Sequence, residues 1–373
     1  MSKKKCNSTA ECAKKTSIGG QALIEGIMMR GPKHSAMAVR DPDGEIVLEK
    51  WENKVSKRSK VFKLPIIRGV FNFADSMIAG YKCLMRSAEI AGLDEEEPKS
   101  KKKKTAEAVV EDSCEVIDTS ALSEESSEQE SAEKVSEEKN EEKGKEKSSS
   151  ALMSAIMVIS TVIGVGLSIV LFIMLPSFIF EWISKLLPAL KPQNAAAASL
   201  IKSVFEGVLR IAVLVLYMLL VTLMKDIRRT FMYHGAEHKT IFCYESGMEL
   251  TVENVKAQRR FHPRCGTSFL ILMLIVGMII SFFIDPLFLA ITNNVPHVAV
   301  RTLIKLLLLP ITMGIGYELI KIAGRHQNWF TRIISAPGMW LQHITVLEPT
   351  DDMIECAIKA FVEVIPEDES DKY

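Results

Sequence analysis

The sequence predicts an α-helical polytopic membrane protein with about four transmembrane helices and a small cytoplasmic α+β layer that includes a β-hairpin. Four apolar stretches lie between residues 151 and 346, and a helix needs roughly 20 such residues to cross a bilayer. The stretch 94–150 is dominated by Glu, Lys and Ser, so we expect a disordered charged linker there. The flanking segments 17–93 and 347–373 show the periodicities of strands and amphipathic helices.

The four predicted spans cover residues 151–175, 205–224, 268–284 and 300–322. The first and third carry no charge. The second and fourth have charged residues near their ends, so they could instead be amphipathic helices that lie against a bundle. Long charged side chains near a helix end can reach the membrane interface, and spanning is therefore the favoured interpretation.

Among the ionisable residues of these stretches, Glu206, Arg210 and Glu318 are costly in lipid, and we expect them to face the bundle interior. Glu206 and Arg210 are four residues apart, which favours an ion pair on one helix face. A proton or ion path is the alternative. Glu318 is the third residue, near the end of the last predicted span.

The loop 225–266 is the short loop richest in Lys and Arg. The positive-inside rule places such a loop in the cytoplasm. With four spans, both termini are then cytoplasmic as well. We therefore expect a multi-pass protein of the cell membrane, with the lipid bilayer as its partner.

The extramembrane segments divide into short elements. Two alternating runs flank the turn Asp41-Pro-Asp-Gly44 and predict a β-hairpin over 36–51. Amphipathic helices are predicted over 64–92 and 350–364, and residues 1–16 are expected to be disordered. The lysine run 101–104 could contact anionic lipid or nucleic acid, but a solvated tether explains it, so no nucleic-acid partner is expected. The seven cysteines show no disulfide framework, which favours reduced thiols.

The predicted cytoplasmic loop contains the best indication of chemistry in the chain. His234 and His238 are four residues apart and share a helix face, with Glu237 between them. This H-x-x-E-H spacing is typical of metallopeptidases in which two imidazoles bind zinc and the glutamate takes a proton from water. His262 and Cys265 close the same loop and are further candidate ligands.

Three interpretations of this group remain open. In a catalytic zinc site, His234, His238 and His262 bind the ion, water fills the fourth position and Glu237 is the base. In a structural site, Cys265 fills that position. In the third interpretation no metal binds, and the histidines form hydrogen bonds with carbonyls or lipid phosphate. Three further residues are reserve ligands: Cys243, Glu245 and Glu25.

The glycine-rich stretch 19–26 (GGQALIEG) is the second unusual motif. Its glycines indicate tight turns or a close approach of backbone. A phosphate-binding loop is one interpretation, but the spacing matches no known nucleotide motif. A packed turn before the hairpin is favoured.

Four runs together resemble one family: GGQALIEGIMMRGP at 19–32, HGAEHKTIFCYE at 234–245, HPRCGTSF at 262–269 and GMWLQHIT at 338–345. They are similar to the YqhQ-like family of bacterial membrane proteins, a domain of unknown function described as a predicted metal-dependent enzyme. The resemblance implies a polytopic protein of the cytoplasmic membrane. The linker 94–150 is not part of that family pattern, and Val346 stands where the pattern has threonine.

Two functions from different classes follow. The first is a metal-dependent hydrolase acting at the membrane, with zinc as the cofactor and Glu237 as the base. The alternative is a non-enzymatic membrane protein for lipid or ion handling, or an assembly factor, with a structural metal site or none. The sequence names neither a substrate nor an oligomeric state.

Overall fold

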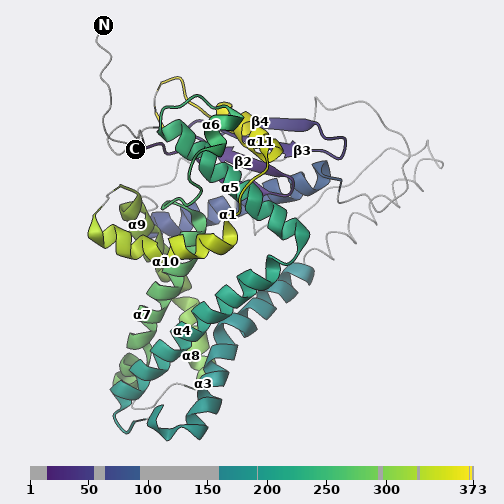
Figure 1. The fold of residues 1–373 in the computed structure, drawn as a ribbon. Coiled ribbons are helices and arrows are strands. Elements are labelled where there is room, and N and C mark those ends of the chain that lie inside the picture. Colours follow the sequence, from purple (N-terminus) through teal and green to yellow (C-terminus); the bar gives the residue numbers. More distant parts are fainter. Residues whose placement is uncertain are drawn as a thin grey trace, which may run out of the picture. The chain divides into compact units, whose positions relative to one another are not determined.

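The computed structural model describes residues 15–53, 64–92, 159–190, 192–292, 297–325, 328–368 and 370–371. The predicted disordered segment 1–16 lies almost entirely outside these residues, and the charged linker 94–150 does so completely. Within the described residues, a four-stranded sheet and many helices form the fold (Figure 1).

The sheet is an antiparallel meander in which the strands follow their order in the chain, from β1 to β4. Its strands are β1 (Gly19–Leu23), β2 (Gly26–Arg30), β3 (His34–Arg40) and β4 (Ile46–Glu52). The predicted hairpin is confirmed: β3 pairs with β4 in a register that joins Arg40 to Ile46. Its turn is held by the Asp41 carboxylate, which accepts the Glu45 N–H at 2.8 Å, and by Gly44, whose φ is +88°.

The glycine-rich stretch forms a second hairpin, which the sequence did not predict. β1 and β2 pair around the two residues Ile24 and Glu25. The φ of Glu25 is +49°, a left-handed conformation at the second central position of a turn that usually selects Gly or Asn. The strand was missed because glycines are rare in strands and the turn lacks these residues.

Beside the sheet lie α5 (Lys225–Glu245), α6 (Val252–Lys256) and α11 (Asp351–Val362). The loop predicted over 225–266 thus contains two helices. A shared core joins them to the sheet, with Met29 of β2, Tyr233 of α5 and Phe361 of α11 all buried. We call the sheet with these three helices the polar layer. The amphipathic helix predicted over 350–364 corresponds to α11.

The amphipathic helix predicted over 64–92 corresponds to α1 (Ile67–Ile90). It buries Gly69 against Tyr317 of α9, and Arg68 forms a paired hydrogen bond with Glu318 at 2.7 and 2.5 Å. Glu318 is thereby tied to a helix that precedes the spans in sequence.

Three helices are long and apolar enough to cross a membrane, or four if a bent pair counts as one span. The segments are Ile159–Leu186, which contains the π-helical turn η2 (Val170–Met174) and α3 (Leu175–Leu186), then α4 (Ala195–Val221), α7 (Gly266–Thr292), and α8 (Val298–Leu307) with α9 (Leu309–Arg325). The last two are bent by 46°. These candidate spans are those of the described residues.

The predicted spans overlap these helices, but their ends differ. The first was expected to end before Pro176, yet the helix continues to Leu186. Pro176 has no N–H for the Phe172 carbonyl. That carbonyl instead accepts Arg210 Nε of α4 at 3.0 Å, and the π-helical turn accommodates the proline. The start of this span, 151–158, lies outside the described residues.

Two other ends also differ from the prediction. α4 starts ten residues before its predicted span, and α7 continues across Pro286 to Thr292. The fourth span is broken near Leu308 because Pro310 lies in the first turn of α9. Two further elements were not predicted: the short 3-10 helix η3 (Pro188–Leu190) and α10 (Trp329–Thr345), which packs against α7 and α9.

Candidate metal centre

α5 presents two histidines of the candidate site one helical turn apart. The ring centroids of His234 and His238 are 4.5 Å apart. Gly235 between them is needed for packing, because a Cβ there would lie 1.9 Å from the Leu347 carbonyl oxygen. The chain after α10 therefore lies directly against this turn of α5.

Both imidazoles are oriented by backbone carbonyls. His234 Nδ1 donates to the Thr345 carbonyl at 3.0 Å, and His238 Nδ1 donates to the Arg260 carbonyl at 2.6 Å. A carbonyl can only accept, so each Nδ1 carries the proton and each Nε2 keeps its lone pair. Metal-binding histidines are commonly held in this way.

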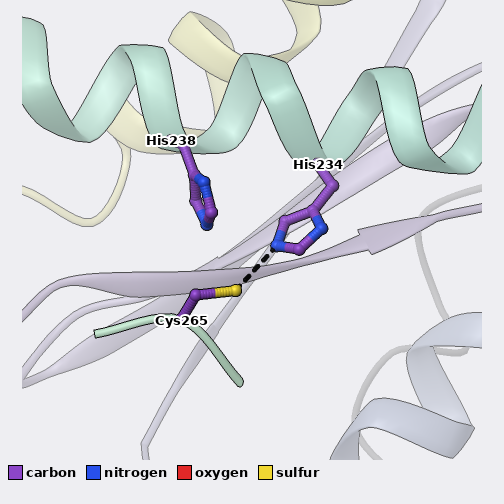
Figure 2. Close-up of side chains that lie close together, drawn as sticks. All are labelled: His234, His238 and Cys265. Carbon is purple, nitrogen blue, oxygen red and sulfur yellow. Dashed lines mark hydrogen bonds between the residues drawn. The ribbon is translucent and has the colours of Figure 1, made fainter. Parts of the chain in front are cut away.

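Cys265 completes the group from the residue before α7. Its sulfur lies 3.1 Å from His234 Nε2, and Figure 2 shows its side chain directed toward the two rings. The ligand atoms of His234, His238 and Cys265 all lie within 4.8 Å of one another. The Thr267 N–H also donates to the sulfur at 3.4 Å.

This arrangement suits a metal ion. Donor atoms around a tetrahedral Zn²⁺ are about 3.3–3.6 Å apart, given bond lengths near 2.0 Å to nitrogen and 2.3 Å to sulfur. The three ligand atoms need only small movements to reach such spacings. The His234–His238–Cys265 group could therefore hold a metal ion.

Glu237 lies on the same helix as the two histidines and is 6% exposed. Its Oε1 accepts the N–H of Gly20 from the edge strand β1 at 3.0 Å. Burial raises the pKa of Glu237, while His234, when it is protonated, and the Gly20 N–H act in the opposite direction. The structure thus holds a buried carboxyl group beside the candidate ligands.

Comparison with known proteins gives the family. A family described as "Protein of unknown function (DUF1385)" matches residues 64–367. The chain belongs to the DUF1385 family. It is also 30% identical over 360 residues to "Uncharacterized protein YqhQ" of Bacillus subtilis (strain 168), an alignment that covers 93% of this chain and 92% of that protein. The expected YqhQ-like relationship is confirmed. No solved structure matches the chain.

The DUF1385 and YqhQ descriptions name no reaction and no ligand. Membership supports a family of unknown function, and the apolar helices suggest a membrane protein. The geometry of His234, His238 and Cys265 is therefore the reason to expect a metal ion in this DUF1385 chain.

His262 lies beside the group but does not join it. Its ring centroid is 5.5 Å from that of His238. Its Nδ1 accepts the Arg264 N–H at 3.3 Å, and its Nε2 lies 3.2 Å from Arg264 Nη2. Burial lowers the pKa of His262 to about 4. Both nitrogens face Arg264, so a role as a ligand stays a prediction.

The reserve ligands have other partners in this DUF1385 structure. Glu245 forms an ion pair with Arg264. Burial acts to raise the pKa of Glu245, but contacts with His262, Arg264 and the Thr16 N–H hold it below its usual value. Glu25 is paired with Arg229, and the Cys243 thiol lies against the Glu249 carbonyl.

Two residues of α10 support the site, and our reasoning from sequence assigned neither a role. Gln342 is fully buried; its Oε1 accepts the His262 N–H and its Nε2 donates to the His262 carbonyl, both at 2.8 Å. Thr345 supplies the carbonyl that orients His234. It is the last residue of α10, where carbonyls have no helical partner. Both lie in the run GMWLQHIT, the one signal that pointed to them.

A pocket of about 320 Å³ lies between the β1–β2 hairpin and α1. Gly19, Gly20, Arg30 and Ser76 are among its lining residues. It borders the same Gly20 that holds Glu237. The glycine-rich stretch therefore forms a strand beside a pocket. The alternative interpretation, a phosphate-binding loop, does not describe these residues.

Proposed function

We propose that this chain is a membrane-embedded, metal-dependent hydrolase whose centre lies at the cytoplasmic surface of the bilayer. His234, His238 and Cys265 are the proposed ligands, and Glu237 is the proposed base. The observation that carries the proposal is that three ligand atoms lie within 4.8 Å of one another, with a buried carboxylate on the same helix.

The ligand set favours Zn²⁺. Two imidazole nitrogens and one thiolate are ligands that zinc accepts readily, and catalytic zinc sites keep three protein ligands with one open position. Among the described residues no fourth ligand joins the group. A bound ion would act as a Lewis acid that polarises the bond to be cleaved.

The chain's own residues supply the other parts of the chemistry. The backbone carbonyls of Thr345 and Arg260 keep the Nε2 atoms available as ligands. Glu237 is held by the Gly20 N–H, so its carboxylate is positioned before substrate arrives. As the base, Glu237 would take a proton from the attacking water and return it to the leaving group.

The cytoplasmic position rests on charge. The polar layer contains the segment 225–266, whose Lys and Arg content favours the cytoplasm. Cysteine ligands also persist in reduced form on that side of the membrane.

The alternative is a non-enzymatic membrane protein for lipid or ion handling, or an assembly factor. One contact favours it: His234 Nε2 and the Cys265 sulfur are already within 3.1 Å, so a hydrogen bond can close the group without an ion. A structural ion that only ties α5 to α7 would fit the same residues.

Metal analysis of the purified protein tests the proposal. We expect about one zinc ion per chain, and we expect it to be lost in Cys265→Ser because a hydroxyl is a far weaker zinc ligand than a thiolate. Cys243→Ser is the matched control: Cys243 is a buried cysteine of α5 outside the group, and its substitution should leave zinc unchanged. Equal zinc content in the two variants would refute the ligand set.

Glu237→Gln separates the enzyme from the alternative. It should retain zinc and lose cleavage of amide, ester or phosphodiester probes that the unsubstituted protein cleaves. Zinc-independent cleavage, or unchanged cleavage in Glu237→Gln, would exclude the hydrolase. Zinc binding without cleavage of any probe, with unfolding on zinc removal, would favour the structural site.

A further inference from the structure

α10 has two faces with opposite environments. Gly338, Leu341, Gln342 and Thr345 are buried in the protein. On the other side, Trp329 is 74% exposed, Ile333 61% and Trp340 59%. At 100° per residue these three side chains lie within about 40° of one another around the helix. The exposed face is therefore a continuous apolar stripe with two tryptophans.

The depth of α10 follows from its crossing with α7. A Cβ on Gly338 would lie 2.4 Å from the Cβ of Ser268, so the two helices touch at the first turn of α7. The uncharged apolar run of α7 starts at Phe269. α10 thus crosses the span at the level where its apolar part begins.

The exposed stripe lies at the level where the apolar surface of α7 begins. Leu270 in the first turns of α7 is 41% exposed, close in sequence to the crossing at Ser268. Trp is enriched where hydrocarbon meets headgroups, because its ring is apolar and its N–H is polar. An amphipathic helix at that level lies in the plane of the interface.

We propose that α10 is an interfacial helix whose face of Trp329, Ile333 and Trp340 contacts the headgroup and upper acyl region of the bilayer. This inference rests on the membrane insertion of the spans, and its consequence for the metal centre rests on the proposed function. The occupant of the stripe is lipid, because α10 crosses α7 where the apolar run of that span begins.

The same helix positions the metal centre. Thr345 orients His234, and Gln342 holds the loop that leads to Cys265. A helix with side chains is about 10–12 Å across, so lipid on one face of α10 and the ligands on the other are one helix diameter apart. The centre is thereby fixed at headgroup depth, within reach of bonds at the membrane surface and away from the bilayer interior.

Tryptophan fluorescence in liposomes tests the inference, because the chain has four tryptophans. Four single-tryptophan variants keep Trp51, Trp182, Trp329 or Trp340 and carry Phe at the other three positions. Each is reconstituted in phosphatidylcholine liposomes with bromine near the headgroup or deep in the acyl chain. Trp182 in the first span reports insertion, and Trp51 of β4 is the control in the sheet.

We expect loss of emission from the Trp329 and Trp340 proteins, stronger with shallow than with deep bromine, and no loss from the Trp51 protein. Emission from Trp329 and Trp340 that is quenched no more than that from Trp51 would overturn the inference. It would also be overturned if their emission were blue-shifted but unquenched, since a second protein would then cover the stripe. An unquenched Trp182 would overturn the insertion on which it rests.

Zinc content measured on the same four proteins separates this inference from the proposed function. Quenching of Trp340 without zinc would support the interfacial helix and refute the metal centre. Bound zinc without quenching of Trp340 would support the metal centre and refute the interfacial helix. The double variant Trp329→Ser/Trp340→Ser should keep zinc, because neither tryptophan belongs to the ligand group; Val362→Ser, which changes an exposed apolar residue of α11, is its control.

Discussion

Two buried glutamates, Glu206 and Glu237, have opposite surroundings. Glu206 of α4 is fully buried and has cations from two helices around it: Lys305 at 2.8 Å, Arg210 at 3.1 Å and Arg301 at 3.8 Å. The Ser177 hydroxyl also donates to it at 2.9 Å. Glu237 of α5 has the Gly20 N–H, and among the described residues no Lys or Arg pairs with it.

The difference separates two uses of a buried carboxylate. Glu206 compensates the charges that α4 and α8 bring into the bundle and so holds these helices together. The predicted pair with Arg210 is present, and the network explains it without an ion path. Glu237 is not neutralised by any such cation, so its charge is available to a bound ion or to a proton. We interpret the first as structural and the second as functional.

The largest expected effect is that of Glu206→Gln. Removing the negative charge leaves Arg210, Arg301 and Lys305 buried together, and breaking such a network costs about 3–5 kcal/mol. Thermal unfolding in detergent should show a large loss of stability. Glu181→Gln is the control, because its pair with Lys202 at 3.0 Å is partly exposed and should be worth no more than about 1 kcal/mol. Equal losses in both variants would contradict the structural role.

Gln342→Ala should have an intermediate effect. It leaves the buried N–H and carbonyl of His262 without their partner, which costs about 1–3 kcal/mol. The loop that leads to Cys265 would loosen, and loss of supporting contacts typically weakens metal affinity by about 10–100-fold. Competition with a zinc chelator measures the affinity.

Arg332→Ala is the matched control for this effect, since Arg332 is an exposed residue of the same helix. It should change neither stability nor zinc affinity. If Gln342→Ala loses stability but keeps full zinc affinity, α10 supports the fold and not the metal centre.

The smallest expected effect on stability is that of Glu237→Gln. The amide oxygen can still accept the Gly20 N–H, and no cation loses its partner. The free energy of unfolding should change by less than about 1 kcal/mol. A loss as large as that of Glu206→Gln would abolish the distinction between the two glutamates and place Glu237 among the structural residues.

Much of the fold could be predicted from the sequence because its signals are local. The apolar runs predicted the spans, and the Pro-Asp-Gly turn predicted the hairpin of β3 and β4. The ends of the helices were harder to predict. Pro176 was taken as a helix end, but the partner of the freed Phe172 carbonyl is Arg210, 38 residues away in the chain. No local rule contains that contact.

In the candidate site, too, the sequence predicts the local features and misses those that depend on tertiary contacts. The spacing of His234 and His238 predicted a shared face because helix geometry fixes it. The contribution of Cys265 depends on how the segment before α7 returns to α5, and the direction of the His262 ring depends on Arg264. Gln342 and Thr345 act from a helix that was not predicted. These are tertiary relations, which spacing alone does not determine.

The core of the polar layer joins strands between residues 19 and 40 to α11, which starts at Asp351. At the end of α5, Thr16 and Asp371 also meet: the Thr16 hydroxyl donates to the Asp371 carboxylate at 2.8 Å. The layer therefore cannot close until α11 has left the ribosome, when the spans of the described residues have already been synthesised. Contacts of such long sequence separation form late. We expect a nascent chain arrested before Asp351 to bind no zinc, so that metal loading follows the synthesis of α11.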